Sequence, residues 1–224
     1  MAGILQGSIS NMVPQGPALY LNAGNTDSYS GSGTTWFDLT VNNYDATLFN
    51  TPTFTSGSGG YFTFASASVE YATVTGSPMS TTAYSKCIWF YLNSSTDNNL
   101  ISNNVGGHYM FFGGTNKLYC GHSSWTGFPT TYPSTGTFSN NTWYFVCLTF
   151  STAAGMTLYR NGILDSTYTA QKTGPDSGQV NLACYSAGGN LLNGRIAQVW
   201  IYNRVLTSTE QNRLFQDTRS LYGV

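Results

Sequence analysis

Short runs of alternating apolar and polar residues, separated by clusters of Gly, Ser, Asn and Pro, recur along most of this 224-residue chain. The runs predict strands and the clusters predict turns, as an antiparallel two-sheet fold requires. The expected strands are 18–21, 61–64, 69–74, 86–92, 100–102, 109–112, 117–120, 143–150, 156–159, 163–164, 180–185 and 195–202. We therefore expect an all-β protein, a two-sheet antiparallel β-sandwich with one short C-terminal helix.

The last expected strand has apolar residues on both faces, which suits a sheet that is covered on each side. One alternating set is Ile196, Trp200 and Tyr202, and the other is Ala197, Val199 and Ile201. Thr207 and Glu210 then have the spacing of a capping box, in which each satisfies a backbone N–H at a helix start. A helix is expected to begin there.

The first sixteen residues are rich in Gly, Ser, Asn and Pro, and their apolar patch contains Ile4 and Leu5. Two interpretations stay open. The segment is either a frayed terminus or a docking arm that lies along a neighbouring subunit. The expected organisation is an N-terminal arm (1–16), a sandwich domain (17–206) and a C-terminal helix and tail (207–224).

Composition excludes some partners. Charged residues make up only 8% of the chain, against about 25% in typical proteins, and the net charge is −1. Without a Lys/Arg cluster, neither nucleic acid nor an anionic membrane surface is favoured. No apolar run approaches the roughly 18 residues of a membrane span. The first ten residues lack the pattern of a secretory signal peptide, so synthesis in a cytoplasm is expected.

The four cysteines show no metal or redox spacing. Cys87, Cys120, Cys147 and Cys184 form no C-x-x-C pair and have no histidine placed to complete a zinc site. Two states stay open: buried free thiols that act as small hydrophobic residues, or at least one disulfide.

Several motifs resemble the laminin G-like, concanavalin A-like jelly rolls. They are the closing run NGRIAQVWIYNRVL at 193–206, the run WFDL at 36–39, and the hairpin formed by TWYFVCLTF at 142–150 and MTLYRNG at 156–162. The resemblance covers roughly residues 17–215. It implies the jelly-roll fold, although such modules serve many functions.

The segment 18–36 resembles the opening of laminin G-like proteins from tailed bacteriophages. This resemblance implies a non-catalytic virion structural protein, either a capsid decoration or head fibre or a tail-fibre component, that attaches to host glycans. The expected partners are other virion proteins and host cell-surface glycans. By analogy with virion spikes and fibres, a homo-oligomer on the virion surface is expected, made in the host cytoplasm. The alternative is a stand-alone carbohydrate-binding lectin module.

Glycoside hydrolases also share this fold, and they need two carboxylates on one strand. This chain has two Glu in total, Glu70 in an expected strand and Glu210 in the helix cap, so no catalytic residue and no enzyme activity is expected. His108 and His122 are expected to be surface or loop-packing residues. The family's usual metal is calcium, but its acidic ligands are mostly absent here. Glu70 is the one weak metal candidate, and no cofactor is expected.

Candidate glycan-binding residues are concentrated in the aromatic, hydroxyl-rich loop 122–133. Aromatic rings stack on the C–H faces of sugars, while hydroxyl and amide groups bind sugar hydroxyls. The alternative is that these aromatic residues anchor the loop or fill a subunit interface. The candidates are Trp125, Phe128, Tyr132, His122, Asn103, Asn104 and Tyr109.

Overall fold

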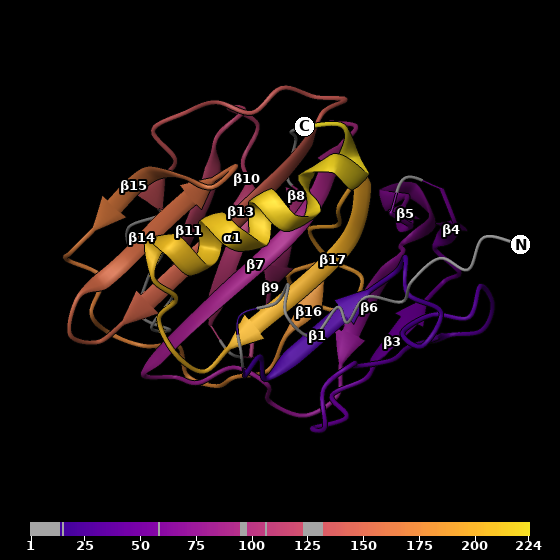
Figure 1. Ribbon diagram of the computed structural model, residues 1–224, viewed down its shortest axis with the longest axis horizontal. Helices are drawn as coiled ribbons and strands as arrows, with labels where there is room; N and C mark the ends of the chain where they lie inside the picture. The colour runs from indigo at the N-terminus through magenta and orange to yellow at the C-terminus, as the bar shows by residue number, and fades with distance from the viewer. Residues whose placement is uncertain (1–13, 15, 58, 95–97, 106, 123–131) are drawn as a thin grey trace, which may run out of the picture.

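A computed structural model describes residues 14, 16–57, 59–94, 98–105, 107–122 and 132–224. The expected fold class is confirmed, since antiparallel strands form two facing layers and an α-helix follows the last strand (Figure 1). The described strands are β1 (Leu19–Asn22), β2 (Thr35–Trp36), β3 (Ala46–Phe49), β4 (Thr53–Thr55), β5 (Tyr61–Phe64), β6 (Tyr71–Val74), β7 (Ala83–Leu92), β8 (Asn98–Asn99), β9 (Ile101–Ser102), β10 (His108–Phe112), β11 (Leu118–His122), β12 (Tyr132–Pro133), β13 (Trp143–Ser151), β14 (Gly155–Arg160), β15 (Ile163–Tyr168), β16 (Asn181–Leu182) and β17 (Gly194–Tyr202). The helical segments are η2 (Ser66–Ser68), α1 (Ser208–Thr218) and η3 (Arg219–Tyr222).

One layer is a single sheet in the order β15-β14-β13-β7-β17-β5-β4, with β1 also paired to β17. We call it the helix-side layer, because α1 lies across its outer face (Figure 1). The far layer contains the sheets β2-β3-β6-β16-β9 and β12-β11-β10-β8. Leu100 joins the two sheets, because its N–H donates to Met110 and its carbonyl accepts from Ala183.

Two apolar cores hold the layers together. The larger core lies between the layers and includes Trp36, Phe62 and Phe90, all fully buried. The smaller core lies between the helix-side layer and α1, where Phe215 stacks on Trp89 with ring centroids 5.9 Å apart. Strands β7 and β17 are therefore apolar on both faces. No helix of the described residues has the length and apolarity of a membrane span.

The predicted alternation of β17 is wrong at one point, because the strand contains a bulge. The register of β17 on β7 shifts between Ile196 and Gln198. Ile196 consequently faces the inter-layer core, whereas Trp200 and Tyr202 face the core under α1. The extra residue at a bulge changes which face the following side chains reach.

The far layer also differs in detail from the prediction. The short strands β2, β3, β4, β8 and β12 were not predicted. The expected strand 180–185 is reduced to Asn181–Leu182, because Ala183 adopts a left-handed conformation with φ of 63°. A left-handed residue interrupts a strand, since extended backbone needs negative φ.

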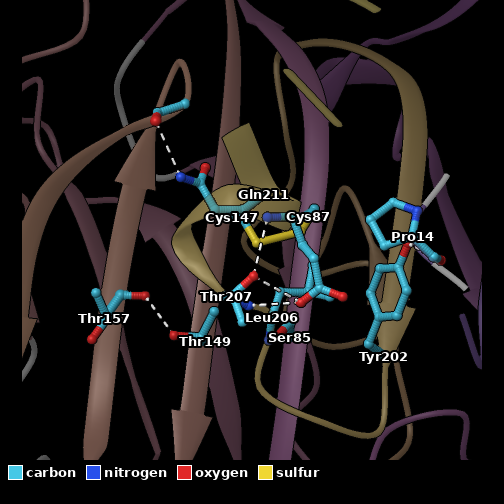
Figure 2. Close-up of a disulfide and its surroundings, with 12 residues drawn as sticks. Pro14, Ser85, Cys87, Cys147, Thr149, Thr157, Tyr202, Leu206, Thr207 and Gln211 are labelled. Carbon is cyan, nitrogen blue, oxygen red and sulfur yellow. Dashed lines mark hydrogen bonds between the residues drawn. A yellow bond between two sulfur atoms is a disulfide. The ribbon is translucent and has the colours of Figure 1, made fainter. Parts of the chain in front are cut away.

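A disulfide joins Cys87 of β7 to Cys147 of β13, directly opposite each other and beneath α1 (Figure 2). Cys120 and Cys184 are free and buried. Of the two states left open by the sequence, the structure therefore has the one with a disulfide, and the other two cysteines are free thiols. At the start of the described chain, the Tyr202 hydroxyl donates to the Pro14 carbonyl oxygen at 3.2 Å. Ile4 and Leu5, the proposed docking residues, lie outside the described residues.

Candidate functional site

Three aromatic side chains lie together on the outer face of the far layer. Strands β10 and β11 pair antiparallel, with Tyr109 opposite Gly121 and Phe111 opposite Tyr119. Their neighbour Met110 points into the inter-layer core. Because side chains alternate across a strand, the three aromatic residues point outward. We call Tyr109, Phe111 and Tyr119 the β10–β11 aromatic face.

The rings of this face contact one another. Phe111 stacks on Tyr119 with centroids 5.5 Å apart and an interplanar angle of 25°, and Tyr109 meets the edge of Phe111 at 5.6 Å. Phe111 and Tyr119 are partly exposed, and the Tyr119 hydroxyl lies 2.9 Å from the Thr115 hydroxyl. The face therefore offers apolar ring surface and hydroxyl groups side by side.

Gly121 lets the Tyr109 ring lie across the backbone of β11. A Cβ atom at this position would be 2.5 Å from the Tyr109 hydroxyl oxygen and 2.7 Å from two ring carbons. Any other residue at position 121 would push the ring away. Tyr109 is only 7% exposed, so Phe111 and Tyr119 form the accessible part of the face.

The two candidate asparagines lie where the chain enters β10. Asn103 exchanges backbone hydrogen bonds with His108, at 2.9 and 3.2 Å, and is 5% exposed. Asn104 is exposed, and its backbone N–H donates to Tyr185. The structure therefore places both asparagines near the strand that carries Tyr109, but only Asn104 presents its side chain to solvent.

A second aromatic pair lies elsewhere on the far layer. Phe49 of β3 stacks on Tyr71 of β6, with centroids 4.6 Å apart and an interplanar angle of 9°. Phe49 is 37% exposed. Beside this pair, Thr35, Thr47 and Thr73 occupy directly opposed positions on β2, β3 and β6. The outer face of the far layer thus combines stacked rings with a row of hydroxyl groups.

The expected surface or loop position of the two histidines is wrong. His108 and His122 are opposite each other on β10 and β11, 0% and 2% exposed, and point into the inter-layer core. His122 lies 2.8 Å from the Tyr84 hydroxyl and 2.7 Å from the Thr173 carbonyl oxygen. Because side chains alternate along a strand, both even-numbered residues lie on the buried face. Each histidine is preceded by a glycine, which has no side chain to reveal this alternation in the sequence.

A buried lysine completes this polar cluster. The Lys86 ammonium group donates to the Ile101 carbonyl oxygen at 3.1 Å and lies 3.3 Å from Nδ1 of His108. Burial lowers the pKa of Lys86 to about 7 and that of His122 to about 3. Burial, and then the positive charge of Lys86, also lower the pKa of His108 well below its usual value. Both imidazoles are thus uncharged at neutral pH.

The remaining loop candidates are described only in part. Trp125 and Phe128 lie outside the described residues. Tyr132 belongs to β12, where it pairs with Cys120 of β11, but its side chain is not described. Strand β12, which follows residues 123–131 in the sequence, therefore pairs with β11, which precedes them.

Glu70 and Glu210 both have partners within the protein. Glu70 is 8% exposed and accepts the N–H of Ala65 at 2.7 Å across η2. Glu210 forms the helix cap and a salt bridge with Arg204 at 2.6 Å. In the part of the chain that the structure covers, no group of three or more His, Cys, Asp or Glu is placed to hold a metal ion.

Fold and site together define an antiparallel β-sandwich with an aromatic outer face. The profile of the family described as the concanavalin A-like lectin/glucanases superfamily matches residues 66–210. The chain belongs to this family. The expected laminin G-like, concanavalin A-like jelly roll is thereby confirmed. A comparison with curated proteins finds no match.

Solved structures share the fold at low identity. A botulinum neurotoxin type C structure, whose reported cell entry depends on two ganglioside molecules, has a TM-score of 0.71 and 16% identity, with 96% of this chain and 53% of that chain covered. The binding domain of Paraclostridial Mosquitocidal Protein 1 has a TM-score of 0.68 and 16% identity, with 89% and 52% covered. Trypanosoma rangeli sialidase has a TM-score of 0.66 and 15% identity, with 91% and 33% covered. This chain therefore spans a third to a half of these proteins, and the likeness establishes the fold alone.

Proposed function

We propose that this chain is a non-catalytic carbohydrate-binding domain that holds glycans on the outer face of the far layer. The observation that carries the proposal is the partly exposed stack of Phe111 on Tyr119, beside the Tyr119 and Thr115 hydroxyls. Sugar rings present C–H faces that stack on such rings and hydroxyl edges that bind such groups. Family membership and the ganglioside-dependent toxin structure support the same class of ligand.

The proposal assigns no catalysis, metal or cofactor to the chain. Its support is the role of the two glutamates. Glu70 accepts a backbone N–H, and Glu210 binds Arg204 and caps α1. A retaining glycosidase needs two carboxylates about 5 Å apart, and an inverting one needs them somewhat further apart. Glu70→Gln is therefore expected to leave glycan binding unchanged.

Glycan binding is tested by a glycan-array screen on the full chain, followed by calorimetric titration with the best ligand. Phe111→Ala and Tyr119→Ala are each expected to weaken binding at least about tenfold, which corresponds to about 1.4 kcal/mol. The reason is that each substitution removes one ring of the stack. Trp125→Ala belongs in the same panel, because the sequence predicts that residue as a contact.

The matched control is Phe37→Ala. Phe37 is 47% exposed and directly follows β2, at the opposite edge of the far layer from β12. Its removal is expected to leave the affinity unchanged. An array without any glycan signal, or equal affinity of Phe111→Ala and the parent protein, would contradict the proposal.

The proposed setting is the surface of a bacteriophage virion, as part of the capsid or tail, where the domain attaches to host glycans. The sequence resemblance of residues 18–36 to phage proteins supports this setting. An antibody against the chain should label purified particles at one location.

Light scattering on the full chain and on a variant lacking residues 1–16 tests the expected homo-oligomer. A full-length monomer would contradict arm-mediated assembly without affecting the glycan proposal.

A further inference from the structure

One arginine on the helix-side layer has no hydrogen-bond acceptor for its guanidinium group among the described residues. Arg195 lies on β17, with Tyr91 of β7 directly opposite on one side and Thr63 of β5 on the other. Its guanidinium carbon is 4.3 Å from the centre of the Tyr91 ring and 5.0 Å from that of Tyr61. The rings hold the cation, but they offer no acceptor for its five N–H donors.

The other four arginines all have an oxygen partner. Arg160 binds Thr137 and Asp165, Arg204 binds Glu210, Arg213 binds Asp217, and Arg219 binds the Val224 carbonyl. In contrast, no described residue accepts a hydrogen bond from the Arg195 side chain, and its Nε is buried without a partner. A buried donor without a partner is costly, so its retention calls for a ligand or another role.

Trp143 completes an aromatic surround. It lies directly opposite Tyr91 on β13, and its ring is 5.6 Å from that of Tyr91 and 5.5 Å from that of Tyr61, at angles of 61° and 63°. All four residues are partly exposed, so solvent reaches the cluster. We call Tyr61, Tyr91, Trp143 and Arg195 the Arg195 cluster.

We propose that the Arg195 cluster binds a carboxylated sugar, such as a uronic or sialic acid. Nε is buried, so the terminal N–H groups of this partly exposed side chain are the ones that would form a bidentate pair with a carboxylate. The neighbouring rings offer apolar surface for the C–H face of the sugar that carries this carboxylate. This site is on the opposite layer from Phe111 and Tyr119, and it does not depend on them.

The test is titration of the full chain with sodium glucuronate and with N-acetylneuraminate, followed by calorimetry and tryptophan fluorescence. For at least one of these two monosaccharides, the expected dissociation constant is about 1 mM. Methyl glucoside, which lacks the carboxylate, and acetate, which lacks the sugar ring, are each expected to bind at least about tenfold more weakly.

Variants separate this site from a structural role. Arg195→Gln is expected to abolish binding, and Arg195→Lys to weaken it about tenfold, because a lysine keeps the charge but not the planar pair of donors. If Arg195→Gln does not fold, the affinities of Arg195→Lys and Trp143→Phe for the sugar acids are measured instead. Arg219→Gln is the matched control, since that arginine lies at the end of α1 and binds the chain terminus.

Unchanged affinity in both Arg195 variants would overturn the proposal, as would equal affinity for glucuronate and methyl glucoside. Equal affinity for acetate and both sugar acids would overturn the proposal that the sugar ring is recognised, because the cluster would then bind any carboxylate. Phe111→Ala is expected to leave sugar-acid binding at the Arg195 cluster intact. The two sites therefore succeed or fail separately.

Discussion

At the residue scale, the core contains three basic side chains, those of Lys86, His108 and His122, and no carboxylate of the described residues hydrogen-bonds to them. Lys86 and Tyr84 come from β7, His108 from β10, and Cys120 and His122 from β11. Asp165 acts on Cys120 only as a minor charge effect. Protonation of either imidazole would place a second positive charge beside Lys86. Protonation of either histidine is therefore unfavourable in the folded state.

Stability should consequently fall in acid. The pKa of His122 is lowered to about 3, so the unfolded chain, with an ordinary value near 6.5, binds more protons between these limits. The contribution of His122 to stability then rises as pH rises through that window and is fully present above about pH 6.5. Each such proton contributes at most about 1.4 kcal/mol per pH unit.

His122→Gln is expected to reduce this dependence, although it also lowers stability at neutral pH by removing the imidazole packed against Phe150. The measurement is the melting temperature at several values between about pH 4 and pH 7, within the titration range of the two states. Asp217→Asn, which changes a surface salt bridge on α1, is the control. A His122→Gln variant with the acid sensitivity of the parent would refute the assignment.

At the element scale, local spacing predicted the helix well and the strand before it less well. The capping box of Thr207 and Glu210 is present, and α1 begins at Ser208, directly after the capping residue. This success has a physical reason, because a cap depends on residues three positions apart. The bulge between Ile196 and Gln198 depends instead on the register of β17 against β7, which are distant in the sequence.

Thr207→Ala tests the contribution of the cap. The Thr207 hydroxyl accepts the N–H of Glu210 at 3.2 Å, and a carboxylate oxygen of Glu210 accepts the N–H of Thr207 at 2.9 Å. Loss of the hydroxyl is expected to lower stability by about 1 kcal/mol and the melting temperature by about 2–4 °C. Thr209→Ala, an exposed change in the same turn, should not lower it. Equal melting temperatures for Thr207→Ala and the parent would refute the role of the cap.

At the scale of the whole molecule, the sequence predicted the layers but only part of the surface. The sequence predicted Tyr109 and Asn104 as glycan contacts but not Phe111 and Tyr119. The Arg195 cluster was also missed. Its members come from β5, β7, β13 and β17, and only strand order brings them together. The pattern of apolar and polar residues predicts which face of a single strand is buried. A site built from several strands can be predicted only when the pairing of those strands is known.

The cysteines illustrate the same limit, because β7 and β13 must be in register before a pair can be assigned. Cys87 and Cys147 are directly opposite in that register, 60 residues apart in the chain. A cross-link that closes a loop of this length restricts the unfolded chain, which is worth about 4 kcal/mol in the chain-entropy model. Reduction should therefore lower stability even though Cys120 and Cys184 are unaffected.

Thiol counting measures this directly. In denaturant without reductant, mass spectrometry should find two alkylated cysteines, Cys120 and Cys184, and after reduction it should find four. The reductant should also lower the melting temperature of the native protein by roughly 10 °C, at about 2–4 °C per kcal/mol for a chain of this size. Cys184→Ala should keep that shift, because it leaves the disulfide in place, whereas Cys87→Ala should abolish it. Four alkylated cysteines before reduction would show that the sandwich is held by packing alone.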